Sequence, residues 1–471
     1  MKILNRKEGS RMKMRGGCTI LIQGKPDRHV RNLPAPDAFS IPRKSKRFTF
    51  SKICVQDSQD VRRGTVLALD PSSFSVPMLS PCSGTVRLRQ NLDHVMIERN
   101  ASLEKEPDLA EFDFPHASNG ADPKAKMRYR LLRQGAWHFL RDVYTTRLPD
   151  PAGTPQAIIV STINLEPFTA RGDVQIRSNL SSFTRGLEHL QSFLEYQPIY
   201  LIFPKVNSEF AHKMRDSLRG YAWVRLIEAS TVYPADDFAL TARSLGLRPS
   251  AEKGSVWGLR AEGVIAFDRV VSANDIIISR VIALGGPGVP HPTHIEVPIG
   301  FPIAKFRELC GITSSNRLIS GGVFSGTSIE EQQLGVDVEC SGITVLPEPE
   351  EREFLSFVRP CFSKRSYSRA FASAIRPRFL ERFTTALRGE SRACVSCGYC
   401  TEVCPARIVP TAIHKLLYQN NIDEVEAFLP DRCIGCGLCS YVCPSKIELA
   451  SEIVGIRDKI WMEQSLGKAG Q

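Results

Sequence analysis

The chain has 471 residues, of which 42% are hydrophobic and 24% are charged, and its net charge is +11. This length exceeds what one hydrophobic core supports and predicts about two to four domains. The sequence contains no apolar run of about eighteen residues and no secretory h-region, which argues against a membrane-spanning helix and against secretion.

The positive charge suits nucleic acid, anionic lipid or an acidic protein partner. The sequence contains no helix-turn-helix, zinc-finger or RNP-type motif, so we do not expect nucleic-acid binding. We expect a cytoplasmic chain that can lie on a membrane surface.

The N-terminal region predicts a tail at 1–12 and a β-rich domain at 13–101, where short β runs alternate with Gly and Pro. The stretch "SQDVRRGTVLALD", followed by "SVPMLSPCSGTVRLR", resembles a barrel-sandwich hybrid domain of the biotinyl/lipoyl type. In such domains a lysine in the hairpin carries the cofactor. Here the hairpin Ser80–Gly84 has no lysine, which favours a structural or docking role over a swinging arm.

A polar linker is expected at 102–126, and a Rossmann-like α/β domain at 127–290. A helix is expected over 127–143 and a buried strand over 157–163, followed by a β-α-β-α-β rhythm typical of a parallel sheet. Ligands of such sheets bind beyond the strand C-termini. Asn164, Glu166 and Phe168 therefore either line a pocket or form an ordinary capping loop. The stretch 282–290, "IALGGPGVP", reads as a turn, and there is no G-x-G-x-x-G or Walker A motif.

The next segments predict a β-grasp (SLBB-like) domain at 291–346 and a basic helical connector at 347–390. The connector's cations are either a solvated helical face or a contact surface for acidic partner subunits or lipid headgroups. We favour contact because they lie beside a cysteine-rich region. They are Arg359, Lys364, Arg365, Arg369, Arg376 and Arg378.

The cysteines are concentrated near the C-terminus. Eight of the fourteen fall between Cys394 and Cys443, in "CVSCGYCTEVCP" and "CIGCGLCSYVCP". Each run has the spacing C-x2-C-x2-C-x3-C-P, which is typical of a pair of [4Fe–4S] clusters. Two structural zinc sites are the alternative, but zinc sites usually combine two C-x2-C pairs. The spacing favours iron and sulfur.

In this spacing the fourth cysteine of each run binds the other cluster. The expected ligands of the first cluster are Cys394, Cys397, Cys400 and Cys443. Those of the second are Cys433, Cys436, Cys439 and Cys404.

The dicluster domain is expected at 391–450, with a helix over 411–429 that suggests an all-α module, and a terminal helix at 451–471. We interpret His414 as a helix-surface residue. The remaining cysteines have no metal-pair spacing and are interpreted as buried apolar groups. They are Cys18, Cys54, Cys82, Cys310, Cys340 and Cys361.

The order of these parts resembles two related families, the NqrA family of the Na⁺-translocating NADH:quinone oxidoreductase and the RnfC family of the Rnf complex. The segments "GGCTILIQGKP", "DPAGTPQAIIVSTINLEPF", "RLISGGVFSGT" and "ITVLPEPEEREFLSFVRP" resemble NqrA. The segment "HIEVPIGFPIAKFRELCG" and the cysteine runs resemble RnfC, which also has a glycine-rich loop for flavin and NADH. This chain instead reads "AWHFLRDVYTTRLPDP" there, which argues against FMN or NADH binding in this chain.

The resemblance implies a peripheral electron-transfer subunit on the cytoplasmic side of the inner membrane, not active alone. It implies a complex with membrane subunits that reduces quinone with NADH and exports Na⁺, with ubiquinone as a candidate ligand. The alternatives are an RnfC-type protein that links NADH and ferredoxin, and a scaffold whose clusters are only structural.

Overall fold

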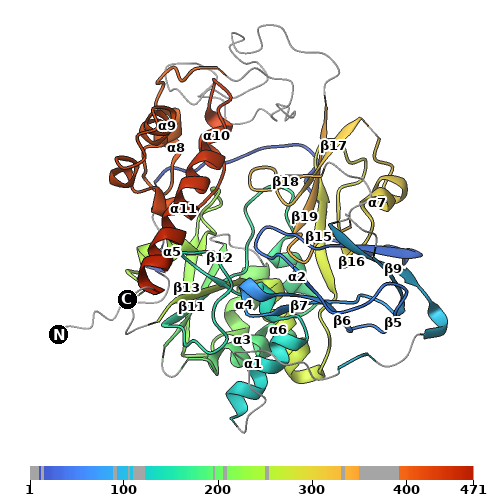
Figure 1. Ribbon diagram of the computed structural model, residues 1–471. Helices are drawn as coiled ribbons and strands as arrows, with labels where there is room; N and C mark the ends of the chain where they lie inside the picture. Colours follow the sequence, from blue (N-terminus) through green and yellow to red (C-terminus); the bar gives the residue numbers. More distant parts are fainter. Residues whose placement is uncertain are drawn as a thin grey trace.

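The computed structural model describes residues 10–11, 15–88, 93–103, 107–109, 122–194, 197–204, 209–249, 254–313, 315–329, 335–348 and 392–469. In these residues the chain forms two six-stranded sheets, two smaller antiparallel sheets and a group of C-terminal helices. The C-terminal helices lie beside the α/β part of the molecule, away from the N-terminal strands (Figure 1). The architecture is therefore multidomain α/β.

The N-terminal region forms two small antiparallel sheets. One has the order β3-β9-β8-β5, with β3 at Ala38–Pro42, β9 at His94–Arg99, β8 at Gly84–Arg87 and β5 at Asp60–Val61. The other has the order β4-β6-β7, with β4 at Lys52–Ile53, β6 at Val66–Asp70 and β7 at Val76–Leu79. Short 3₁₀ turns occupy Pro71–Ser73 and Ala101–Leu103. The hairpin at Ser80–Gly84 is buried, and the Ser80 hydroxyl donates to the Cys82 carbonyl at 2.6 Å.

The central sheet has the strand order β1-β13-β12-β11-β14-β10. All neighbours are parallel except the pair β10 and β14. The strand order reverses at β11, which is where doubly wound sheets bind ligands. The strands are β1 at Ser10–Arg11, β13 at Val224–Ala229, β12 at Ile199–Pro204, β11 at Ala157–Ser161, β14 at Val256–Arg260 and β10 at Arg141–Asp142.

Both faces of this sheet are buried, because alternate strand residues pack into different clusters. Ile158 and Val160 face one core, together with residues of α3 and α6, whereas Ala157 and Ile159 face a second core beneath α5. The helices are α1 at Pro123–Arg133, α2 at Gly172–Arg177, α3 at Leu180–Gln191, α4 at Glu209–Ser217, α5 at Phe238–Ser244 and α6 at Ala261–Ala273.

The helix expected over 127–143 is shorter than predicted. Helix α1 ends at Arg133, and Gly135 follows with φ of 80°, a left-handed conformation that stops a helix. The chain then forms a 3₁₀ turn at Trp137–Phe139 and strand β10. This turn places the Trp137 ring 5.6 Å from that of Trp257 and 5.8 Å from that of Phe193. Core packing of Trp137 thus replaces the second half of the expected helix.

The second six-stranded sheet has the order β18-β17-β19-β15-β16-β2. The central strands β15 and β19 are parallel, β2 is parallel to β16, and the other pairs are antiparallel. Helix α7 at Ile303–Leu309 packs on the sheet through Ile303 and Phe306. The strands are β18 at Thr327–Ser328, β17 at Asn316–Ser320, β19 at Gly342–Pro347, β15 at Ser279–Gly285, β16 at Thr293–Pro298 and β2 at Val30–Asn32.

Three strands lie in other sheets than their sequence positions suggest. β15 falls inside the segment 127–290 expected for the α/β domain, but it pairs with β16 and β19. β2 leaves the N-terminal domain to join the same sheet, and β1, in the expected tail, pairs with β13. Local sequence cannot reveal such pairings, because a strand's partner is chosen by tertiary packing.

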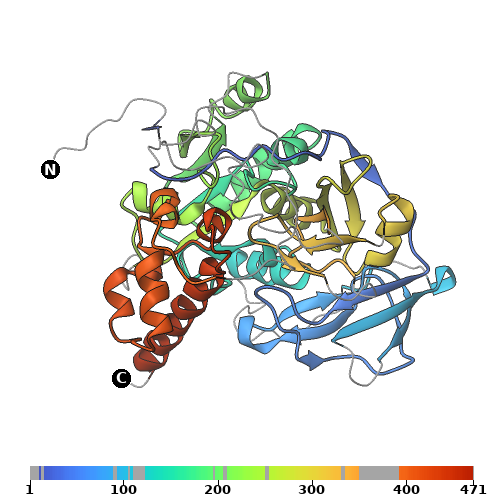
Figure 2. The same cartoon turned by 90° about the horizontal axis from the view of Figure 1, so that it is seen from above.

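The C-terminal helices are α8 at Tyr399–Val403, α9 at Pro410–Tyr418, α10 at Leu438–Val442 and α11 at Leu449–Ala469. The helix expected over 411–429 ends at Tyr418, because Asn420 is left-handed with φ of 55°, and 3₁₀ turns follow at Val425–Phe428 and Pro430–Arg432. Seen from above, these helices lie on one side of the α/β part and the N-terminal sheets on the other (Figure 2). The basic connector expected at 347–390 lies outside the described residues, apart from 347 and 348.

Of the helices described, none is both long enough and apolar enough to cross a membrane.

Candidate metal centres

The two cysteine runs fold in the same way. In each, a left-handed glycine begins a five-residue helix, Gly398 with φ of 77° before α8 and Gly437 with φ of 74° before α10. The cysteine that ends each helix has nearly the same backbone angles, with φ of −68° at Cys404 and −69° at Cys443. The sequence repeat is therefore also a structural repeat.

The structure gathers the eight cysteines around two cavities. The first encloses about 320 Å³ that protein atoms leave free, and the second about 340 Å³. Cys394, Cys397, Cys400 and Cys443 line the first. Cys404, Cys433, Cys436 and Cys439 line the second. Each cavity thus has three cysteines from one run and the fourth from the other, which is the exchange expected from the spacing.

The cysteines surround these cavities rather than converge on one point. In the described part of the chain, no three His, Cys, Asp or Glu side chains lie close enough to hold a single metal ion. A cuboidal cluster instead needs one thiolate at each of four separated corners, and the remaining walls are largely apolar, with Ile447 and Leu449 in the first cavity and Ile434 and Leu438 in the second. The residues fit a [4Fe–4S] cluster in each cavity.

Burial sets the electrostatics of the second cavity. It raises the pKa of Cys436 well above the ordinary thiol value, and nearby thiols add to the increase. Burial, with the charges of Cys433 and Cys404, raises the pKa of Cys439 to about 12. These thiols therefore favour the protonated form by themselves, whereas a bound metal centre deprotonates a coordinating thiol.

Backbone N–H groups point at several sulfur atoms. The amides of Ala406, Arg407 and Ile408 hydrogen-bond to Cys404 and oppose the burial that raises its pKa. Gly435 N donates to Cys433 Sγ at 3.4 Å, and the Thr411 hydroxyl lies 3.0 Å from Cys400 Sγ. Such groups orient metal ligands and tune the redox potential.

The two cavities differ in their surroundings. On the first, Cys397 is exposed and Val395 is 67% exposed. The second packs against the rest of the molecule. There the Tyr233 hydroxyl donates to the Cys436 carbonyl at 2.9 Å, and Arg243 Nη1 donates to the Arg432 carbonyl at 2.8 Å. Sequence periodicity carried no signal for these contacts, because the partners lie about 190 to 200 residues apart.

The loop that follows β11 holds other parts of the chain in place. Glu166 accepts hydrogen bonds from Phe324 N at 3.1 Å and from Ser325 N and Oγ at 2.7 Å. Asn164 donates to the Ala170 carbonyl, and Phe168 is buried with φ of 64°. Of the two interpretations of this loop, these contacts favour the capping loop.

His414 and the isolated cysteines lie away from the cavities. His414 Nδ1 is 2.7 Å from Glu452 Oε2, across from α9 to α11. Five of the isolated cysteines lie in described segments, and none of those five lines either cavity. Cys361 is outside the described residues.

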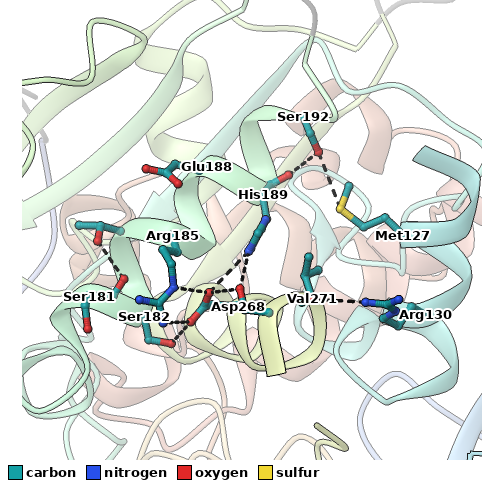
Figure 3. Close-up of polar contacts among 12 residues, drawn as sticks. Met127, Arg130, Ser181, Ser182, Arg185, Glu188, His189, Ser192, Asp268 and Val271 are labelled. Carbon is teal, nitrogen blue, oxygen red and sulfur yellow. Dashed lines mark hydrogen bonds and ion pairs between the residues drawn. The ribbon is translucent and has the colours of Figure 1, made fainter. Parts of the chain in front are cut away.

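A polar cluster between α3 and α6 also contains Ser, His and Asp (Figure 3). Asp268 accepts from Ser182 Oγ at 2.5 Å and from Arg185 Nη2 at 2.8 Å. His189 Nε2 lies 3.1 Å from Ser272 Oγ and 3.5 Å from Asp268 Oδ1. A catalytic relay needs the carboxylate and the hydroxyl on different ring nitrogens. The cluster therefore reads as a structural link between the two helices.

Family comparisons agree with this two-part organisation. Residues 123–274 match the model described as NqrA second alpha/beta domain, and residues 380–447 match the model described as 4Fe-4S dicluster domain. The chain thus combines an NqrA-type α/β domain with a ferredoxin-type dicluster domain.

Whole-chain comparison identifies homologues of one kind, the NqrA component of the Na(+)-translocating NADH-quinone reductase. The chain is 26% identical to this protein from Serratia proteamaculans, over 88% of this chain and 91% of the relative. It is also 26% identical to that of Alcanivorax borkumensis, over 79% and 82%. The resemblance to NqrA with an added dicluster domain is therefore confirmed.

Among solved structures, an NAD⁺-reducing [NiFe]-hydrogenase in the air-oxidized state aligns with 14% identity and a TM-score of 0.37. The alignment covers 50% of this chain and 47% of that one. A similarity this low does not establish a common fold.

Proposed function

We propose that this chain is a peripheral electron-transfer subunit of a Na⁺-translocating NADH:quinone reductase-like complex. It transfers electrons by means of two [4Fe–4S] clusters and contributes to quinone reduction. The observation that carries the proposal is the pair of cavities, each lined by four cysteines with the fourth exchanged between the runs. Homology to NqrA over 88% of the chain supports the assignment to such a complex.

Each [4Fe–4S] cluster, when bound, supplies a one-electron redox centre. Cys394, Cys397, Cys400 and Cys443 would hold the first, and Cys404, Cys433, Cys436 and Cys439 the second. The apolar walls exclude water from the thiolates, and the backbone amides around Cys404 stabilise negative charge there. The exposed edge at Val395 and Cys397 lets a partner protein come close to the first site.

The wider assignment follows from the same homology. We infer that the chain acts only within a complex whose membrane subunits carry out ion transport, and that it lies on the cytoplasmic face of the inner membrane. Ubiquinone is the candidate electron acceptor of that complex.

An RnfC-type function is the second candidate, and the dicluster domain favours it. It differs in its flavin chemistry. FMN titration of the purified chain separates the two: the favoured function predicts no tight binding, whereas tight FMN binding would support the RnfC-type function.

The first experiment is an anaerobic iron and sulfide assay with EPR of the dithionite-reduced protein. We expect about eight irons per chain and the spectrum of two interacting clusters. About two zinc ions and no signal would overturn the redox function, and clusters that cannot be reduced would leave a scaffold.

A further inference from the structure

Three cations from separate parts of the chain meet beside the second cysteine cavity, and we call this group the cationic junction. Lys46 lies in the loop between β3 and β4, Arg141 lies on β10, and Arg260 ends β14. The two guanidinium groups approach the same ring, with Arg141 Cζ 5.9 Å and Arg260 Cζ 5.6 Å from the Phe238 centroid. The charge of Arg141 lowers the pKa of Lys46, after the larger effect of burial, so these two cations are also near neighbours.

The carboxylates around the junction already have partners. Asp236 Oδ2 is 2.8 Å from Arg260 Nη1, and Glu339 pairs with Arg47 at 2.5 Å. Asp237 caps α5 by accepting from Leu240 N at 2.9 Å. Glu166, whose charge acts on Lys46, accepts from Phe324 and Ser325.

Arg141 and Lys46 have no such partner. Within the described residues, neither side chain forms an ion pair or a hydrogen bond, and Arg141 Nε is buried without an acceptor. Burial, with repulsion from Arg47 and Arg260, lowers the pKa of Arg141 to about 9. A buried guanidinium without an acceptor is costly, and an anion would relieve that cost.

The position suits a ligand. Arg260 lies at the carboxyl end of β14, beside the point where the strand order reverses, and it donates to the Ile163 carbonyl at 2.9 Å. The Lys46 residue is exposed and the Arg260 side chain is 34% exposed, so the junction is open to solvent.

The junction also borders the second cysteine set. Ile434, next to Cys433, packs on the core that contains Phe238. Arg457, whose charge acts on Lys46, donates to the Cys433 carbonyl at 2.8 Å. A molecule held at the junction would therefore lie beside this cysteine loop.

We propose that Lys46, Arg141 and Arg260 bind the oxyanion group of a small molecule, a phosphate ester or a carboxylate, next to the second cysteine set. Guanidinium groups bind both kinds of oxyanion with paired, charge-assisted hydrogen bonds. Side-chain cations here would do what backbone amides do in a glycine-rich loop. That the bound molecule exchanges electrons with the chain rests on the proposed function, whereas the binding site itself does not.

The test is equilibrium dialysis of the full chain, purified anaerobically, against labelled inorganic phosphate and, separately, labelled acetate at constant ionic strength. The variants are Arg141→Gln and Lys46→Gln. The matched controls are Arg225→Gln, an exposed arginine on the same sheet, and Lys52→Gln, an exposed lysine of the N-terminal domain. Circular dichroism checks folding, and Lys46→Gln, at an exposed residue, keeps the test decisive if Arg141→Gln does not fold.

We expect saturable binding that weakens about tenfold or more in each junction variant and is unchanged in both controls, since each junction variant loses a charge-assisted hydrogen bond. Tighter phosphate than acetate binding would identify a phosphate ester, and the reverse a carboxylate. No saturable binding, or equal weakening in the controls, would overturn the proposal. Iron assays on the same samples separate the two ideas: eight irons without phosphate or acetate binding would remove the site alone, and binding without iron would remove the electron-transfer function alone.

Discussion

At the residue scale, the fourth cysteine of each run decides which cavity it belongs to. Cys404 follows the first run in sequence but lines the cavity of the second, and Cys443 does the reverse. A short loop can place three thiols around one cavity, and the helix after the third points the last thiol away.

This exchange gives a first prediction. Cys404→Ser should remove the EPR signal of the buried second cluster and leave that of the first, and Cys443→Ser should do the opposite. Iron content should fall from about eight towards about four per chain in both. Cys310→Ser, at a cysteine outside both cavities, is the control. If Cys404→Ser instead abolished the first cluster, the assignment of ligands would be wrong.

His138 should make stability depend on pH. Its side chain is buried, it hydrogen-bonds to the Gly135 carbonyl at 3.0 Å, and its Nε2 has no partner in the described structure. Burial lowers its pKa to about 4, whereas an unfolded histidine titrates near about 6.5. The unfolded state therefore binds more protons below pH ~6.5, and stability falls as the pH drops from about 6.5 to about 4.

We expect a loss of about 2 kcal/mol between about pH 7 and about pH 5 from this residue. His138→Phe keeps a ring against Phe48, which lies 5.2 Å away, but cannot titrate. Its unfolding temperature should therefore depend less on pH than that of the parent. His212→Gln, at an exposed histidine, should leave the pH dependence unchanged. Parallel pH profiles for the parent and His138→Phe would rule this effect out.

At the element scale, the two cysteine loops are equivalent in backbone but not in surroundings. A Cβ on Gly437 would lie 2.7 Å from the Phe324 carbonyl oxygen, whereas one on Gly398 would meet nothing within 4 Å. Both glycines have left-handed backbone angles. Only the second loop is therefore sensitive to a neighbouring part of the fold.

Alanine at the two glycines separates these costs. Gly398→Ala pays only for the left-handed conformation, about 1 kcal/mol, whereas Gly437→Ala must also displace Phe324 and should cost at least about 2 kcal/mol. Urea unfolding monitored through the dicluster absorption measures both. Equal costs would mean that the contact with Phe324 contributes nothing.

At the scale of the whole molecule, aromatic residues hold the C-terminal helices on the body. The Phe324 ring is stacked on Tyr233 at 5.5 Å and meets the edge of Tyr441 at 5.1 Å. Tyr233 also reaches the Cys436 carbonyl. Segments next to both six-stranded sheets and the N-terminal segment near Gly17 contribute to this contact, because Gly17 N donates to the Val403 carbonyl at 2.8 Å.

Removing the central ring should loosen this contact without unfolding the rest. In Phe324→Ala, amide hydrogen exchange should accelerate at 433–438 and remain unchanged in α3 and α6, because the lost packing is local. Phe210→Ala, which removes a partly buried ring from α4, is the matched control. Unchanged exchange at 433–438 would show that other contacts hold the helices.

The sequence by itself determined the parts whose logic is local. The cysteine spacing predicted which thiols share a cavity, because a cluster fixes the distances between its ligands within a short loop. The alternation of strands and helices predicted the parallel sheet around β11, because buried strands carry continuous apolar runs.

Only the tertiary structure decided the rest, because those features depend on residues far apart in the chain. It moved β15 and β2 into the second sheet, ended α1 so that Trp137 enters the core, and turned Glu166 towards the loop at 324–325. It also brought Lys46 and Arg141 together without a counter-charge among the described residues. Each residue is unremarkable in its own segment, and only long-range packing gives it a neighbour.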